Sequence, residues 1–156
     1  MYVSRKASGC ESDKIDKRGN IRMKITVIDG QGGKIGKTVI EQLVKSHPEL
    51  ELYAIGTNSI ATSTMMKAGA VYGATGENPC IVNAGDSDII IGPIGIVFAN
   101  ALLGEITPAI ATAIGSSKAY KILIPTNRCN HYIVGCEETG LSEYIRQVCE
   151  KVDSML

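Results

Sequence analysis

The sequence predicts one α/β domain with a doubly wound, mainly parallel sheet and helices on both faces. Short runs of β-branched apolar residues alternate with segments of helical periodicity along most of the chain. The first run leads directly into a glycine-rich turn at residues 30–36, and the run Ile89-Ile90-Ile91 is continuously apolar, as strands covered on both faces are. The 156 residues suffice for one such core and not for two ordinary domains. We therefore predict a single Rossmann-like domain.

The domain is expected to cover residues 23–156. Residues 1–22 are rich in Lys, Arg, Ser, Asp and Gly and have almost no apolar periodicity, which predicts a loose N-terminal tail. Whether this tail is native to the chain or an added segment stays open at this point.

The first half of the domain is expected to alternate strands with helices. Apolar residues recur at helical spacing after the glycine-rich turn until His47-Pro48 ends the pattern. The expected elements are a strand at 24–28, a helix at 35–45, a strand at 51–55, a helix at 60–67, a short strand at 70–72 and a polar turn at 75–79.

The second half begins with the clearest strand, because residues 89–91 are three consecutive isoleucines. The expected elements after it are helical pieces at 96–103 and 108–114, a strand at 121–124, a last strand at 132–134 and an amphipathic helix at 141–152.

Composition argues against several classes of function. Sixteen basic and sixteen acidic residues produce no net field toward nucleic acid or an anionic membrane, and one Phe without Trp offers few surfaces for stacking bases. The uncharged run 89–104 contains Pro93 and Asn100 and is shorter than a membrane span. Five cysteines without a CxxC pair or a signal-peptide pattern indicate reduced thiols, so we predict a soluble, cytoplasmic protein.

The glycine-rich turn is the strongest functional signal. It lies between a predicted strand and a predicted helix, where backbone N–H groups and the helix N-terminus favour a phosphate group. The glycine spacing is G-x-x-G-x-x-G, a variant of the dinucleotide-binding pattern. The predicted phosphate-binding residues are Gly30, Gln31, Gly32, Gly33, Lys34, Ile35 and Gly36. The alternative is that the glycines only permit close packing of helix on strand.

A nucleoside-triphosphatase loop fits the same segment less well. Gly36-Lys37-Thr38 resembles the end of such a loop, but Gln31 stands where its leading glycine is required. Gly92 and Pro93, and not an aspartate for magnesium, follow the isoleucine strand.

The identity of a dinucleotide is left open by residues 56–58. NAD-binding proteins usually carry an acid about 20 residues after the glycines, whereas this chain has Gly56-Thr57-Asn58 there. Asn58 can hydrogen-bond a ribose, yet no arginine stands beside it to bind a 2′-phosphate. Asn58 is equally suited to cap the following helix. NAD and NADP both remain candidates, with Thr57 and Asn58 among the predicted contacts.

Further polar turns follow the later strands and are expected at the same edge of the sheet, because the carboxyl ends of parallel strands lie together. One contributes Gly92, Pro93 and Ile94, and another contributes Asn127. Arg128 has the planar fork that pairs with phosphate or carboxylate, and Cys129 is a candidate nucleophile. Cysteines in such positions are more often packing residues, so catalytic roles for Arg128 and Cys129 are hypotheses. Cys129, His131 and Cys136 match no standard zinc spacing, and we predict no metal.

From residue 23 to about residue 152 the chain resembles a family of small bacterial proteins known as a domain of unknown function. The resemblance is carried by five segments: Gly30-Gln31-Gly32-Gly33, Gly56-Thr57-Asn58, Thr75-Gly76-Glu77-Asn78, Gly92-Pro93-Ile94-Gly95 and Asn127-Arg128-Cys129-Asn130. It implies a Rossmann-like fold and no particular activity.

Two functions are consistent with these observations. The first is a nucleotide- or dinucleotide-binding protein, reductase-like, whose small domain is completed by a second copy in a homo-oligomer. The second is a non-catalytic nucleotide sensor or interaction protein. A phosphate-bearing small molecule is the expected partner in both.

Overall fold

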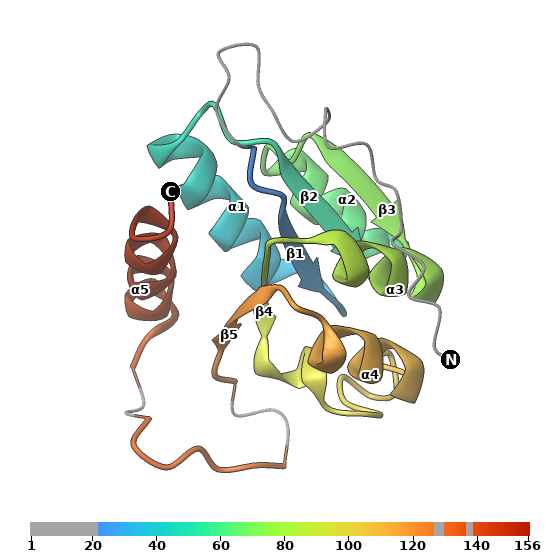
Figure 1. Cartoon of the computed structure of the whole chain (residues 1–156). Coiled ribbons are helices and arrows are strands. Elements are labelled where there is room, and N and C mark those ends of the chain that lie inside the picture. The colour runs from blue at the N-terminus through green and yellow to red at the C-terminus, as the bar shows by residue number, and fades with distance from the viewer. Residues whose placement is uncertain (1–21, 127–129, 137–138) are drawn as a thin grey trace, which may run out of the picture.

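The structure is a computed structural model that describes residues 22–126, 130–136 and 139–156. Its centre is a five-stranded parallel sheet in the order β3-β2-β1-β4-β5 (Figure 1). The strands are β1 (Ile25–Asp29), β2 (Leu52–Gly56), β3 (Tyr72–Thr75), β4 (Ile89–Pro93) and β5 (Tyr120–Ile124). The predicted α/β class and parallel sheet are confirmed.

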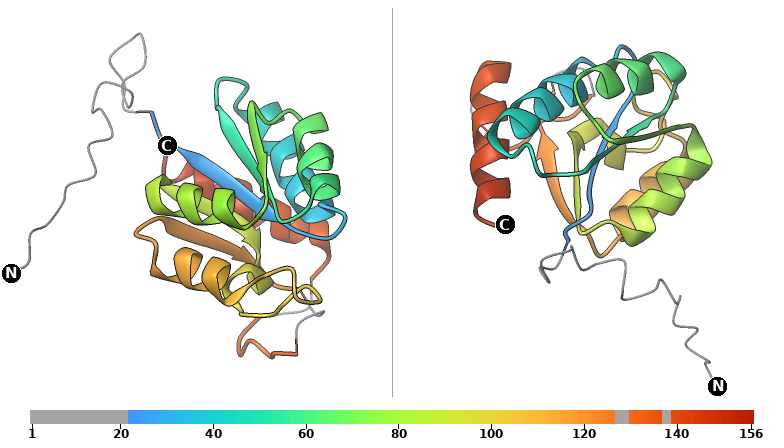
Figure 2. Two further views of the ribbon diagram at one scale, coloured as in Figure 1. Left: turned by 90° about the vertical axis from the view of Figure 1, so that its right-hand side faces the viewer. Right: turned by 90° about the horizontal axis from the view of Figure 1, so that it is seen from above.

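Helices cover both faces of the sheet (Figure 2). One face carries α1 (Lys34–Ser46), α2 (Ser59–Lys67) and α5 (Leu141–Asp153). The other carries α3 (Glu77–Asp86), α4 (Pro108–Ser116) and the short 3-10 helix η2 (Ile94–Val97). The doubly wound arrangement follows from the buried strands, because β1 and β4 carry apolar side chains on both faces and each face needs a cover.

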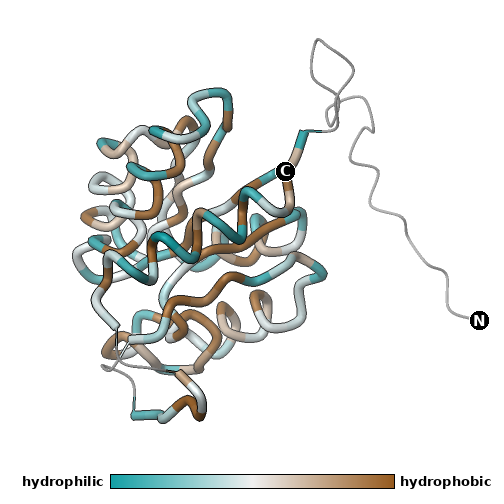
Figure 3. Tube along the Cα trace, turned by 90° about the vertical axis from the view of Figure 1, so that its left-hand side faces the viewer, coloured by the Kyte–Doolittle hydropathy of each residue, from teal (hydrophilic) through white to brown (hydrophobic). Residues whose placement is uncertain are grey.

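The core consists of two apolar clusters separated by the sheet. Ile89 and Ile91 of β4 pack toward α1 and α5, whereas Ile90 between them packs toward α3 and α4. Helix α5 completes the first cluster with one apolar stripe, and its residues alternate between hydrophilic and hydrophobic in Figure 3. Burial on both faces explains why the isoleucine strand was readily predicted.

The order of the strands determines where the topological switch point of the sheet lies. The chain runs outward from β1 through β2 to β3 and then returns to place β4 on the other side of β1. The connections after β1 and β4 therefore diverge at the carboxyl ends of two adjacent strands. This topological switch point is where open α/β sheets bind their ligands.

Two predictions in the first half of the domain are wrong in detail. The third strand covers residues 72–75 and not 70–72, and the segment predicted as a turn at 75–79 contains the start of α3. Pro79 lies in the first turn of α3, where a missing N–H costs no helical hydrogen bond. Gly76 and Pro79 are typical of a turn, but glycine and proline are also compatible with the start of a helix.

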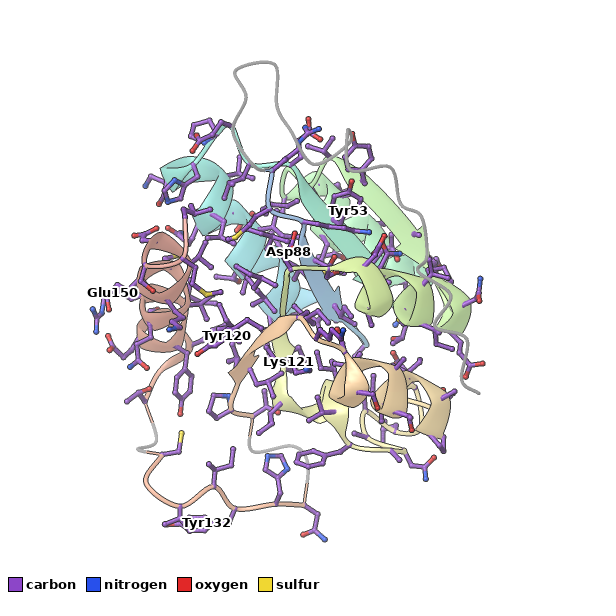
Figure 4. All side chains as sticks on the ribbon, in the orientation of Figure 1. Tyr53, Asp88, Tyr120, Lys121, Tyr132 and Glu150 are labelled. Atoms are coloured by element: carbon purple, nitrogen blue, oxygen red, sulfur yellow. The ribbon has the colours of Figure 1, made fainter. Side chains whose placement is uncertain are left out.

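Two predictions in the second half are also wrong. Residues 96–103 do not form a helix beyond η2, because Asn100, Leu102 and Leu103 have left-handed backbone angles. Residues 132–134 form no strand, and Tyr132 lies away from the sheet in the segment between β5 and α5 (Figure 4). No helix in the described part of the chain has the length and apolar character to cross a membrane.

Candidate functional site

A cleft of about 490 Å³ opens at the carboxyl ends of β1, β4 and β5. It lies at the switch point between β1 and β4, as expected for a ligand site in this fold. The glycine-rich turn forms one wall, the ends of β4 and β5 form the floor, and the start of α5 forms the opposite wall. The lining residues are Asp29, Gly30, Gln31, Gly32, Gly33, Lys34, Ile35, Pro93, Leu102, Pro125, Thr126, Thr139, Leu141 and Tyr144.

Packing accounts for three glycines of the turn. A Cβ on Gly33 would lie 2.8 Å from backbone atoms of Ala61, and Gly33 has a φ of +66°. A Cβ on Gly30 would lie 2.7 Å from the Thr57 hydroxyl, and one on Gly36 would collide with Met65. These positions therefore need glycine whether or not a ligand binds.

Gly32 differs from these three glycines. It is exposed in the cleft, and a Cβ there would meet only the Lys34 side chain, at 4.0 Å. Packing within the described chain gives no reason for glycine at this position. Close approach of a ligand to the backbone does give one.

Several N–H groups of the turn are used by the protein itself. Asp29 is buried at the end of β1, and its carboxylate accepts the Gly30 N–H and the Gly36 N–H, each at 2.8 Å. Burial raises the pKa of Asp29, while the backbone hydrogen bonds counteract that shift. Gly33 N–H donates to Gly30 O at 2.9 Å. Among the described residues, no hydrogen bond uses the N–H of Gly32 or Lys34.

Glu105 occupies the side of the turn that faces β2. Its Oε2 accepts the Gln31 N–H at 2.9 Å and the Asn58 side-chain amide at 3.0 Å, and it also accepts the Thr57 hydroxyl. Burial opposes ionisation of Glu105, but these three donors outweigh it and hold its pKa below the usual 4.5. A carboxylate anion is therefore present beside the turn at neutral pH.

The side of the cleft toward β5 contains two threonine hydroxyls and no carboxylate among its lining residues. The hydroxyls of Thr126, after β5, and Thr139, before α5, are buried and have no hydrogen-bond partner within the described residues. Pro93, Pro125 and Leu141 supply apolar surface around them. Buried hydroxyls without a protein partner are commonly satisfied by water or ligand.

The structure brings most of the predicted phosphate-binding residues into one wall. Gly30 to Ile35 line the cleft, as does Pro93, while Gly36 lies buried behind the turn. Gly92 lies against the carbonyl of Ile28, and Ile94 begins η2, so neither lines the cleft. The catalytic candidates Arg128 and Cys129, and the predicted contact Asn127, lie outside the described residues.

Thr57 and Asn58 do not line the cleft, because both are bound to Glu105. Asn58 also accepts the Ala61 N–H at 2.9 Å and so caps α2. The alternative interpretation of Asn58 as a helix cap is confirmed. The amide nitrogen of Asn58 in addition donates a hydrogen bond to the Glu105 carboxylate.

Four residues of the site were not predicted from the sequence: Glu105, Thr139, Leu141 and Tyr144. Glu105 is 74 positions from Gln31, and the other three belong to the approach to α5. None is part of a motif. Thr139, Leu141 and Tyr144 line the cleft, whereas Glu105 does not line it and bonds to Gln31 of its wall, and all four positions depend on the tertiary fold. A weak signal was available for Glu105 alone, since it follows the strand that ends at the switch point.

Two cysteines of the described chain, Cys80 and Cys149, are poor candidates for a reactive thiol. Burial raises the pKa of Cys80 to about 11, and Cys149 has its pKa raised for the same reason. A thiol with a raised pKa is a poor nucleophile at neutral pH. The described ranges contain no group of three His, Cys, Asp or Glu side chains arranged to hold a metal ion.

Residues 24–156 match a protein-family model described as a domain of unknown function (DUF3842). The chain belongs to this family. The predicted resemblance to a family of unknown function is confirmed. A search of curated proteins found no match to the chain.

Proposed function

We propose that the chain binds a nucleotide or dinucleotide of the NAD or NADP kind, held by its phosphate groups at the glycine-rich turn. The observation that carries this proposal is that the backbone N–H groups of Gly32 and Lys34 are unpaired within the described residues. Both residues belong to the wall of the cleft, and they stand at the N-terminus of α1. A helix N-terminus with free N–H groups favours an anion.

The local charges limit where a phosphate can bind. The Glu105 carboxylate lies on the β2 side of the turn, and the Asp29 carboxylate at the end of β1, which lines the cleft, is bonded to the N–H groups of Gly30 and Gly36. The Lys34 side chain is exposed on the cleft side and adds a positive charge there. We therefore place the phosphate over Gly32 and Lys34, toward β4.

The rest of the cleft suits a nucleotide-sized group. Pro93, Pro125 and Leu141 form apolar surfaces on which a flat ring can pack, and the Thr126 and Thr139 hydroxyls supply polar contacts. Pockets that take cofactors have this mixture of mainly apolar walls with few polar groups, and volumes of roughly 300–1,000 Å³.

The test measures binding of NAD, NADP, AMP and ATP by isothermal calorimetry to the wild type and to two variants of one residue. Gly32→Asp places a carboxylate beside the phosphate, whereas Gly32→Asn places a neutral side chain of the same size there. We expect Gly32→Asp to weaken binding about tenfold or more and Gly32→Asn to weaken it about threefold or less. Equal effects of the two variants, or no binding to the wild type, would contradict the proposal.

We also propose that the cleft is completed in a homo-oligomer. Leu103, Tyr132 and Val134 are 97%, 85% and 86% exposed, on the two segments that also supply Leu102 and Thr139 to the cleft. Phe98 and His131 bring these segments into contact, with ring centroids 4.9 Å apart. Exposed apolar side chains beside a ligand site are typical of a protein interface. A reductase-type reaction would use the second copy to enclose its substrate.

Light scattering on the wild type and on the double variant Leu103→Ser, Tyr132→Ser tests this arrangement. We expect a dimer or larger assembly that dissociates in the double variant. A wild-type monomer at all concentrations would contradict the proposed oligomer while leaving nucleotide binding to be decided by calorimetry.

A further inference from the structure

We infer that Glu105 recognises the ribose of the bound nucleotide and makes the site select a free 2′-hydroxyl over a 2′-phosphate. This inference rests on the proposed nucleotide binding and goes beyond it, since it names the chemical class of the ligand. The group would be an NAD-type dinucleotide or a simple ribonucleotide, and NADP would be rejected.

The position of Glu105 supports this role. Gly30 and Gln31 follow β1, Thr57 and Asn58 follow β2, and the Glu105 carboxylate bridges the two segments through its bonds to Gln31, Thr57 and Asn58. It therefore lies at the carboxyl ends of the two neighbouring strands. In dinucleotide-binding sheets the ribose next to the adenine binds at this place, and an acid at the end of the second strand accepts its hydroxyl hydrogen bond.

The chain lacks that acid in its usual position and has Thr57 and Asn58 there. Both side chains donate to Glu105, so the residues that replace the acid serve to position a carboxylate from elsewhere in the chain. All three donors bond to Oε2. Oε1 has no hydrogen-bond partner in the described residues and is available to a ribose hydroxyl.

The backbone that carries Glu105 is shaped for this contact. Asn100, Leu102 and Leu103 have φ values of 65°, 54° and 57°, a conformation that costs non-glycine residues free energy. The segment closes on itself, because Asn100 N–H donates to Ile106 O at 2.7 Å and Glu105 N–H donates to Leu102 O at 3.2 Å. A strained segment that holds one carboxylate against the N–H of Gln31, a residue of the cleft wall, is typical of a functional position.

The charge of Glu105 determines the selectivity. Its three donors stabilise the carboxylate form, so it is an acceptor for a hydroxyl and a repulsive neighbour for a phosphate. No arginine or lysine contacts Glu105 within the described residues. A 2′-phosphate at this position would therefore face an uncompensated negative charge.

The experiment compares the affinities of NAD and NADP for the wild type and Glu105→Gln by calorimetry. For a site that takes only mononucleotides, the matched pair is AMP and 2′-deoxyAMP. We expect the wild type to bind NAD at least about tenfold more tightly than NADP, and Glu105→Gln to reduce that ratio to about threefold or less. In the mononucleotide pair we expect the same loss of preference for the ribose hydroxyl.

A purely structural role for Glu105 would lower both affinities in Glu105→Gln and leave their ratio unchanged, which would overturn the inference. Equal binding of NAD and NADP to the wild type, or tighter binding of NADP, would also overturn it while the proposed function stands. Absence of binding by every nucleotide would overturn both. If Glu105→Gln does not fold, Glu105→Asp keeps the charge but shortens the side chain. We then expect weaker NAD binding with NADP still rejected, and equal losses for both ligands would count against the inference.

Discussion

On the β2 side of the glycine-rich turn the polar groups are paired within the protein, whereas on the β5 side several are not. The N–H groups of Gly30 and Gln31 bond to Asp29 and Glu105. Across the turn, the N–H groups of Gly32 and Lys34 have no protein partner in the described chain. The buried hydroxyls of Thr126 and Thr139 also have no hydrogen-bond partner among the described residues. One stretch of backbone thus has N–H groups that carboxylates of the protein occupy on the β2 side and N–H groups without a protein partner among the described residues on the other side.

This contrast separates the two explanations for the glycines. Gly30, Gly33 and Gly36 are required by neighbouring atoms, as the packing alternative predicted. Gly32 has open space around it and lines the cleft where we propose that a ligand binds. A glycine motif therefore contains both kinds of constraint, and only the structure assigns each glycine to one of them.

The largest effect is expected from alanine at Gly33. A Cβ there meets the Ala61 backbone at 2.8 Å and the φ of +66° is unfavourable, so we expect the free energy of unfolding to fall by about 3 kcal/mol. Gly32→Ala is the matched control and should change stability by about 0.5 kcal/mol or less. Urea denaturation of the two variants makes the comparison. Similar losses at both positions would remove the distinction between the two sides of the turn.

A smaller loss is expected from Thr57→Val on the paired side. The variant removes one of three donors to the Glu105 carboxylate, and we expect about 1 kcal/mol lower stability because the site is partly exposed. Thr38→Val, which removes an exposed bond within α1, is the control and should cost about 0.5 kcal/mol or less. If Thr57→Val is as stable as the control, the bonds to Glu105 do not hold the turn.

The location of the turn could be predicted from the sequence because its signals are local. Glycines after an apolar run and before a helical pattern identify a strand–turn–helix unit without any tertiary information. The parallel sheet with helices on both faces also followed from the alternation of strands and helices along the chain. The residues from Gly30 to Ile35, which the sequence had indicated as ligand contacts, all line the cleft.

Glu105 could not be predicted in the same way. Residues 96–103, which precede Glu105, were predicted to be helical, but the left-handed angles at Asn100, Leu102 and Leu103 redirect the chain toward the turn. Such angles at leucine carry no sequence signature, because they are imposed by tertiary contacts. The sequence therefore did not indicate that Glu105 binds Thr57 and Asn58, and both residues were predicted to be ligand contacts instead.

The Glu105 carboxylate also predicts how the paired side responds to acid. Its pKa in the folded state lies below 4.5, so the stability it contributes is present above that pH and is lost as the pH falls through the folded-state pKa. We expect the wild type to be more stable than Glu105→Gln at pH 7 and the difference to shrink below pH 4.5. The pKa of Asp29 is raised mainly by burial and also by the charge of Glu105, so its opposing contribution is expected to be smaller in Glu105→Gln. Unfolding measured from pH 7 to pH 3 provides the check, and a constant difference would show that the ionised form has no special role.

The smallest effect on stability is expected from Thr126→Val, and its sign distinguishes the two sides. The Thr126 hydroxyl is buried without a partner among the described residues, so replacing it with a methyl group removes an unsatisfied group and keeps the volume. We expect the free energy of unfolding to stay the same or rise by about 0.5 kcal/mol, in contrast to the loss in Thr57→Val. If the hydroxyl serves the ligand, nucleotide affinity should fall about fivefold in the same variant, since a neutral hydrogen bond contributes about 1 kcal/mol. Denaturation and calorimetry on one preparation separate the two quantities. A loss of stability comparable to that of Thr57→Val would show that Thr126 is a structural residue and that the β5 side is paired after all.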